Sequence, residues 1–158
     1  MSAIPEPGSP APDFTLPRDG GGTVSLHDFR GKTVVLYFYP KDDTTGCTKE
    51  AIGFSEKIED FAKAGAIVIG VSKDSVQKHD KFKAKYDLKV ILAADENLDV
   101  IKAYGVWVEK NMYGRRYMGT QRATFLIDKN GIIAKVWPKV KLKDHVDDVL
   151  QSVREQAG

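Results

Sequence analysis

The run TVVLYFY, residues 33–39, most strongly limits the folds open to this chain. Consecutive β-branched, aliphatic and aromatic residues predict a strand buried on both faces, as in parallel sheets that are covered by other layers. Pro40 stops the run because proline cannot donate a hydrogen bond to a sheet. A second run of this kind, AIVIGVS, occupies residues 66–72. The chain therefore belongs to the α/β class.

A helical pattern lies between these two runs and is ended by Gly65. Its apolar residues share one stripe at helical spacing: Ala51, Phe54, Ile58, Phe61 and Ala62. Strand, helix and strand in this order predict a βαβ unit. Before it, the glycines 20–22 read as a loop that joins two short strands, FTL and TVSL.

The remaining elements alternate in type. Ser75 is a candidate N-cap for a helix with apolar Val76, Phe82 and Tyr86, and a strand over 90–96 and a short helix closed by Gly105 follow. ATFLID and IIAKVW flank the turn sequence KNG, and a final helix carries one apolar face: Leu142, Val146, Val149, Leu150 and Val153. The order predicts one domain over residues 1–158, an α/β/α sandwich with a central mixed sheet.

Composition and charge exclude several classes of protein. The chain is 42% apolar and 29% charged with a net charge of +2, and its basic stretches 113–117 and 135–143 are short, so we expect no nucleic-acid partner. The N-terminus has no signal-peptide pattern and no segment is as apolar as a membrane span, so we expect a cytoplasmic protein without membrane contact. His27, His79 and His145 are far apart, and we expect no metal and no cofactor.

The single cysteine, Cys47, stands where chemistry rather than packing is expected. It follows a buried strand and a Thr-Thr-Gly turn, and lies on the same helical arc as Phe54 and Phe61, so its thiol should point toward the sheet. Unpaired amides and the positive dipole end at a helix start stabilise an anion and so favour the nucleophilic thiolate. Position alone predicts a reactive thiol.

Pro40, Thr44 and Cys47 form the pattern P-x-x-x-T-x-x-C, which resembles the active-site signature of peroxiredoxins. These are thiol peroxidases with a thioredoxin-like fold in the AhpC/TSA superfamily. The stretch FYPKDDTTGCTKEAIGF and the later YGVWVEKNMYGRRYMGTQRATFLID are similar to the bacterioferritin comigratory protein, or PrxQ, subfamily. The resemblance runs over nearly the whole chain and implies antioxidant reduction of hydrogen peroxide and organic hydroperoxides.

The resemblance also implies roles for individual residues. Cys47 matches the peroxidatic cysteine that becomes sulfenic acid, and Thr44 matches the threonine whose hydroxyl bonds thiolate or peroxide. Pro40 matches the proline that walls the pocket from water, and Arg122 matches the arginine that favours the thiolate. Glu50 is a candidate for orienting that arginine.

Simpler readings of these residues remain open. Thr44 could be an ordinary N-cap, Pro40 a strand terminator and Glu50 a first-turn acid that complements the helix dipole. Arg122 could be a surface charge, and Cys47 an inert core residue.

The chain departs from the family at the second cysteine. Many relatives carry a resolving cysteine five residues after the first, where Ile52 stands here, and others carry it in the segment that matches HDKFKAKY. The resemblance therefore implies a one-cysteine enzyme, regenerated by thioredoxin, glutaredoxin or a low-molecular-weight thiol, unless Ile52 is an engineered replacement. Relatives of this subfamily are often monomers, which is the expectation here.

Three other classes compete with this reading. A dithiol reductase needs C-x-x-C, and Thr44 occupies the first position of that pattern. A cysteine hydrolase needs a histidine base that is spatially adjacent to Cys47. A redox sensor would react with about one equivalent of peroxide and stop.

Overall fold

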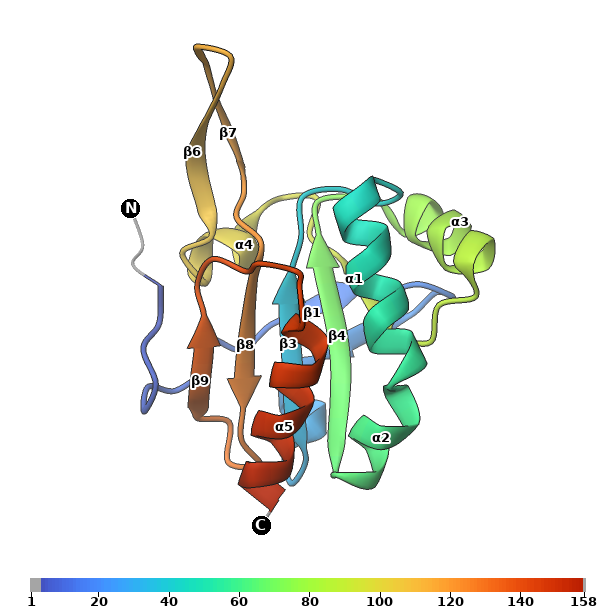
Figure 1. Ribbon diagram of the computed structural model, residues 1–158, viewed down its shortest axis with the longest axis vertical. Helices are drawn as coiled ribbons and strands as arrows, with labels where there is room; N and C mark the ends of the chain where they lie inside the picture. Colours follow the sequence, from blue (N-terminus) through green and yellow to red (C-terminus); the bar gives the residue numbers. More distant parts are fainter. Residues whose placement is uncertain (1–3, 158) are drawn as a thin grey trace.

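A computed structural model, which describes residues 4–157, is built around a five-stranded mixed sheet with the order β5-β4-β3-β8-β9 (Figure 1). Its strands are β3 (Thr33–Phe38), β4 (Ala66–Ser72), β5 (Ile91–Ala94), β8 (Ala123–Ile127) and β9 (Ile133–Trp137). β3, β4 and β5 are parallel, whereas β8 runs antiparallel to both β3 and β9. The predicted α/β class and mixed sheet are confirmed.

β3 is the centre of the fold, as its continuous apolar sequence predicts. Successive side chains of a strand point to opposite faces of the sheet, so this segment supplies two separate clusters of buried residues. One cluster contains Val34, Leu36 and Phe38, and the other contains Val35, Tyr37 and Tyr39.

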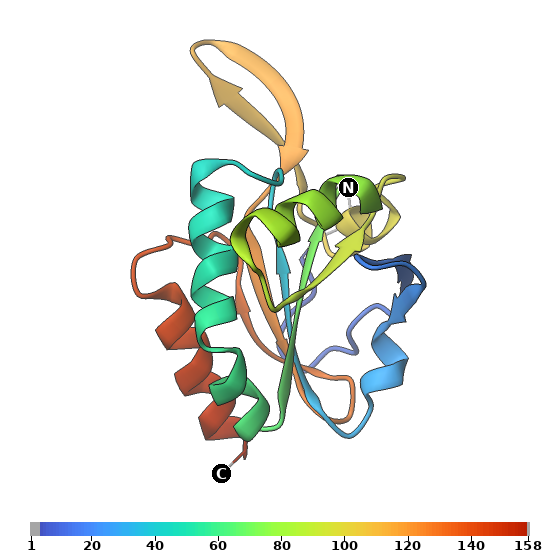
Figure 2. The ribbon, with the colours of Figure 1, turned by 90° about the vertical axis from the view of Figure 1, so that its right-hand side faces the viewer.

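Different kinds of structure cover the two faces (Figure 2). The Val35 face packs against α1 (Thr45–Glu56), α2 (Ile58–Lys63) and α5 (His145–Ala157), with α3 (Val76–Tyr86) beside β5. The other face is covered by four short elements: β1 (Thr15–Pro17), β2 (Thr23–Ser25), the 3-10 helix η1 (Leu26–Phe29) and α4 (Asp99–Ala103). The second outer layer is thus only partly helical.

The helical segment before β4 is not the single helix that the sequence predicts. It breaks at Lys57, where φ is −102° and ψ is 9°, and continues as α2. Periodicity does not carry across such a break, so Phe61 is buried while Ala62 is exposed. Leu142, expected on the last helix, precedes α5 and is half-buried.

The hairpin formed by β6 (Trp107–Met112) and β7 (Arg115–Thr120) projects away from the sheet and was not predicted (Figure 1). Tyr113 and Gly114 form its turn with φ of 54° and 76°, the positive values that tight hairpin turns require. Its strands alternate in sequence, but they are largely exposed and lack the continuous apolar run that marks β3. Within residues 4–157, no helix combines the length and the apolar character of a membrane span.

Candidate active site

The connection from β3 to α1 places Cys47 at the carboxyl end of the central strand. Thr44 is the N-cap residue of α1, with φ of −97° and ψ of 157°, and Cys47 follows in the first turn. The cysteine is 1% exposed and belongs to the buried cluster between the sheet and α1. The predicted direction of the thiol, toward the sheet, is confirmed. Amides of a first helical turn have no partner within the helix and favour an anion there.

Arg122, which precedes β8, joins Cys47 to Glu50. Its Nη2 lies 3.3 Å from Cys47 Sγ, and its Nη1 donates a 2.7 Å hydrogen bond to Glu50 Oε1. A Cβ atom at Gly46 would lie 3.0 Å from Nη2, so the close approach of the guanidinium depends on the missing side chain. One planar cation therefore holds the thiol sulfur and a carboxylate in one arrangement.

The Glu50 carboxyl is buried at 2% exposure, and Oε2 has no hydrogen-bond partner among residues 4–157. Burial raises the pKa of Glu50 to about 7, although the charge and hydrogen bond of Arg122 act in the opposite direction. For Arg122, burial acts to lower the pKa, but the charges of Glu50 and Cys47 outweigh it and the pKa rises. The arginine therefore stays charged, whereas burial makes the ionised form of Glu50 less favourable than it would be in water.

Thr44 and Pro40 lie in the connection that leads to Cys47, but neither is hydrogen-bonded to its thiol. Thr44 is exposed, and its Oγ1 donates to the carbonyl of Lys41 at 2.9 Å rather than capping α1. No hydrogen bond between described residues joins Thr44 to Cys47. Pro40 is half-buried and follows the end of β3. Their roles toward a peroxide stay predictions.

The histidines are engaged elsewhere, which weakens the reading as a cysteine hydrolase. His79 contacts Asp42, His145 contacts Thr124, and His27 contacts Asp13. Burial lowers the pKa of His145 to about 4, so this ring is neutral at neutral pH. Among residues 4–157, none of the hydrogen bonds of Cys47 comes from a histidine that could act as its base.

Tyr37 and Lys110 lie near the site although no motif singled them out. Burial raises the pKa of Tyr37 strongly, and the charges of Glu50 and Cys47 add to it. Gly70 makes room for this ring, because a Cβ there would lie 2.6 Å from Tyr37 Cζ. Burial lowers the pKa of Lys110 on β6. For Tyr37 the sequence did hold a signal: side chains alternate between the two faces along β3, which places Tyr37 on the same face of the sheet as Cys47.

The chain is similar to proteins of the AhpC/TSA family. The AhpC/TSA family model matches residues 7–136. A bcp protein of Coxiella burnetii is 54% identical over 145 residues, which make up 92% of this chain and 96% of its own, and Peroxiredoxin Bcp of Bacillus subtilis is 49% identical over 96% and 97%. A solved structure of Peroxiredoxin Q from Xanthomonas campestris superposes with a TM-score of 0.87 at 41% identity, covering 92% of each chain.

Proposed function

This chain belongs to the AhpC/TSA family and is a thiol-dependent peroxidase of the Bcp or PrxQ type, and we propose that Cys47 is its peroxidatic residue. The observation that carries this proposal is the contact between Arg122 Nη2 and Cys47 Sγ, made at the N-terminus of α1. A cation and a helix start both favour a thiolate, which is the form that attacks a peroxide.

In the proposed reaction the Cys47 thiolate attacks the terminal oxygen of a hydroperoxide. A sulfur–oxygen bond forms as the O–O bond breaks, and the leaving oxygen takes a proton to become water or an alcohol. Sulfur is oxidised to sulfenic acid by two electrons. Arg122, already within reach of the sulfur, would stabilise the negative charge that moves toward the leaving oxygen.

Regeneration would need thiols from outside the chain, because Cys47 is the single cysteine of the sequence. A first thiol attacks the sulfenic sulfur, releases water and leaves a mixed disulfide; a second thiol displaces Cys47 as a thiol. Thioredoxin, glutaredoxin and low-molecular-weight thiols are the candidate reductants. We further propose that the protein acts as a monomer in the cytoplasm, where a free thiol is kept reduced.

Intact-mass analysis tests the proposed function. After one equivalent of hydrogen peroxide we expect the chain to gain one oxygen atom at Cys47, and we expect at least one candidate reductant to reverse this gain. With that reductant in excess, peroxide consumption should continue over many equivalents. Consumption that stops after about one equivalent with every reductant would instead identify a redox sensor.

Ile52 offers a second prediction. The helical spacing predicts Ile52 on a flank of the helix, away from the stripe of Phe54, Ile58 and Phe61. In the structure it is half-buried and packs against the Cys47 cluster, so a smaller residue should cost about 1 kcal/mol rather than nothing. Along the intact α1, residues 47 and 52 are separated by about 7.5 Å of rise, which is too far for a disulfide. We expect Ile52→Cys to fold and to form a 47–52 disulfide with peroxide only as the first turns of α1 unwind.

Mass spectrometry distinguishes the outcomes for this variant. Loss of two hydrogens, together with resistance to sulfinic acid and faster reduction by a dithiol, is the expected result. Ile52→Ser is the matched control, because it removes the same apolar contact and adds no thiol. Persistent oxygen adducts on Cys47 in Ile52→Cys would show that α1 does not open far enough.

A further inference from the structure

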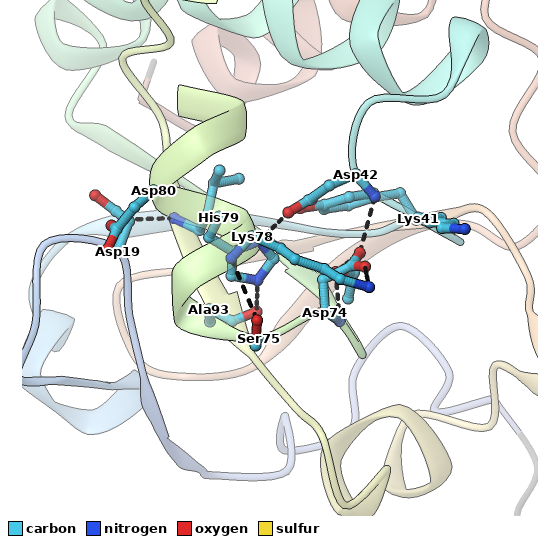
Figure 3. A network of polar contacts seen from close by, with 12 residues as sticks. Asp19, Lys41, Asp42, Asp74, Ser75, Lys78, His79, Asp80 and Ala93 are labelled. Carbon is cyan, nitrogen blue, oxygen red and sulfur yellow. Dashed lines mark hydrogen bonds and ion pairs between the residues drawn. The ribbon is translucent and has the colours of Figure 1, made fainter. Parts of the chain in front are cut away.

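The loop before α1 is fastened to α3 by a buried polar network (Figure 3). Asp42 lies in this loop, and its Oδ2 is 2.6 Å from His79 Nδ1 on α3. The other ring nitrogen, Nε2, is 3.0 Å from the carbonyl oxygen of Ala93. Asp42 is 8% exposed and His79 is fully buried. No residue of this network is among those the family motif singles out.

The partners of the ring fix where its protons lie. A carbonyl oxygen only accepts, so Nε2 must carry a hydrogen, and Nδ1 needs a second proton between it and the Asp42 carboxylate. Asp42 Oδ1 is taken by the hydroxyl of Tyr39, which donates at 2.5 Å. Burial alone would lower the pKa of His79, but the hydrogen bond and charge of Asp42 raise it. These contacts therefore favour the charged form of His79, an imidazolium paired with the Asp42 carboxylate.

Other contacts hold the backbone of the same loop. The amide of Asp42 donates to Asp74 Oδ2 at 2.8 Å. Asp43 adopts a φ of 59°, which is uncommon for a residue other than glycine, and its carboxylate accepts hydrogen bonds from Lys85 at 2.8 Å and from Tyr86 at 2.6 Å. Lys85 and Tyr86 are on α3, so two adjacent loop residues are bound by this one helix.

The loop leads directly into the turn that carries the thiol. Thr44 Oγ1 bonds back to Lys41, and the Thr44 carbonyl accepts the first bond of α1 from the Thr48 amide at 2.8 Å. Any shift of Asp42 would thus move the N-cap and the first turn, including Cys47. Because the thiol is only 1% exposed, an outside thiol also requires this turn to move.

We propose that His79 is a positioning residue for Cys47, which it holds in the closed, peroxide-reactive arrangement by fastening the 41–44 loop to α3 through Asp42. Release of this contact loosens the first turn of α1, which slows attack on peroxide and opens Cys47 to external thiols. The inference rests on the proposed role of Cys47 as the peroxidatic residue.

The test compares His79→Asn and His79→Leu with the parent protein. Asparagine keeps a donor that can reach Asp42, whereas leucine keeps none. We expect His79→Leu to speed alkylation of Cys47 by a bulky thiol reagent by roughly tenfold or more, because a charged hydrogen bond is lost. The alkylation rate of His79→Asn should lie between those of the parent and of His79→Leu. Amides of the first turn of α1 should exchange faster in the same order, while those of α5 do not change.

Lys83→Met is the matched control. Lys83 is also on α3, but its ion pair, 2.7 Å to Asp19, fastens the β1–β2 loop instead. This variant should leave alkylation and first-turn exchange as in the parent. If His79→Leu and Lys83→Met change both quantities alike, or if neither does, His79 has only a general structural role and the proposal is overturned.

Two further measurements keep the proposal testable if a His79 variant does not fold. Asp42→Asn should show the same faster alkylation. In the unmodified protein, first-turn protection relative to α5 should be full at low pH and decline as pH rises through the raised pKa of His79. The groups around the ring that bear on this titration are Asp42, Tyr39, Asp74 and Lys78. Glu50 on α1 has its own pKa raised to about 7, so a decline that persists in Asp42→Asn would belong to Glu50 and would overturn the assignment to His79.

Both measurements are made without peroxide, so they separate the two claims. A parent protein that fails to turn over peroxide would contradict the proposed function, but the alkylation and exchange results would still test the role of His79. Protection of α1 that does not depend on pH, with unchanged alkylation of Asp42→Asn, would overturn the role of His79 alone.

Discussion

Cys47→Ser is expected to abolish steady-state reduction of peroxide, with a loss of at least roughly a thousandfold, as removal of a nucleophile does in other enzymes. A serine hydroxyl is not ionised at neutral pH and is a far weaker nucleophile. Serine is similar in size to cysteine, and Arg122 is within reach to donate to its oxygen, so the buried hydroxyl need not stay unpaired. Peroxide consumption with an excess of reductant measures the effect.

Ala51→Ser is the matched control for this experiment. Ala51 is 1% exposed on α1 and belongs to the same buried cluster as Cys47, so its substitution also places a hydroxyl there. This variant should keep the activity of the parent even if it is somewhat less stable. Turnover by Cys47→Ser at the parental rate would remove Cys47 from the reaction and, with it, the proposed function.

Arg122→Ala has the second largest expected effect. It removes the hydrogen bond to Cys47 Sγ and leaves Glu50 buried without its cation. A charged hydrogen bond contributes about 1.5 to 3 kcal/mol, so peroxide attack should slow by roughly ten- to a hundredfold and a smaller fraction of thiolate should be present at neutral pH. The pKa of Glu50, already raised to about 7, should rise further and neutralise the buried carboxyl.

Thiolate absorbance in the ultraviolet, followed against pH, and the rate with peroxide are the two measurements. Arg122→Lys separates charge from geometry, because a lysine supplies one point charge and cannot bridge Cys47 and Glu50 with a planar fork. We expect an intermediate rate. A titration and a rate that are both unchanged in Arg122→Ala would exclude the arginine from the site.

Local sequence patterns predicted the parts of the fold that depend on local chemistry. Apolar runs placed β3 and β4, and Ser75 caps α3 as expected, with its Oγ accepting from the Lys78 amide at 3.2 Å. Helical spacing also placed the thiol of Cys47 on the face toward the sheet. Each of these features follows from neighbouring residues alone.

Features that depend on distant residues were harder to predict. Arg122 is 75 residues from Cys47 in sequence, and only resemblance to a family suggested that they meet. No sequence pattern predicted that His79 would hold the loop before α1, although it lies at helical spacing from Val76 and Phe82 on the buried stripe of α3. The β6–β7 hairpin was missed because its side chains are mostly exposed and its pattern is weak.

The interruption of the helical segment at Lys57 limits how far any melting of α1 can spread. Helix formation is cooperative, so a continuous helix that begins to unravel at one end tends to lose successive hydrogen bonds along its length. Here α1 and α2 are separate, and Phe61 of α2 remains anchored in the core. If the first turn of α1 opens, as proposed above, α2 should therefore keep this segment attached to the sheet.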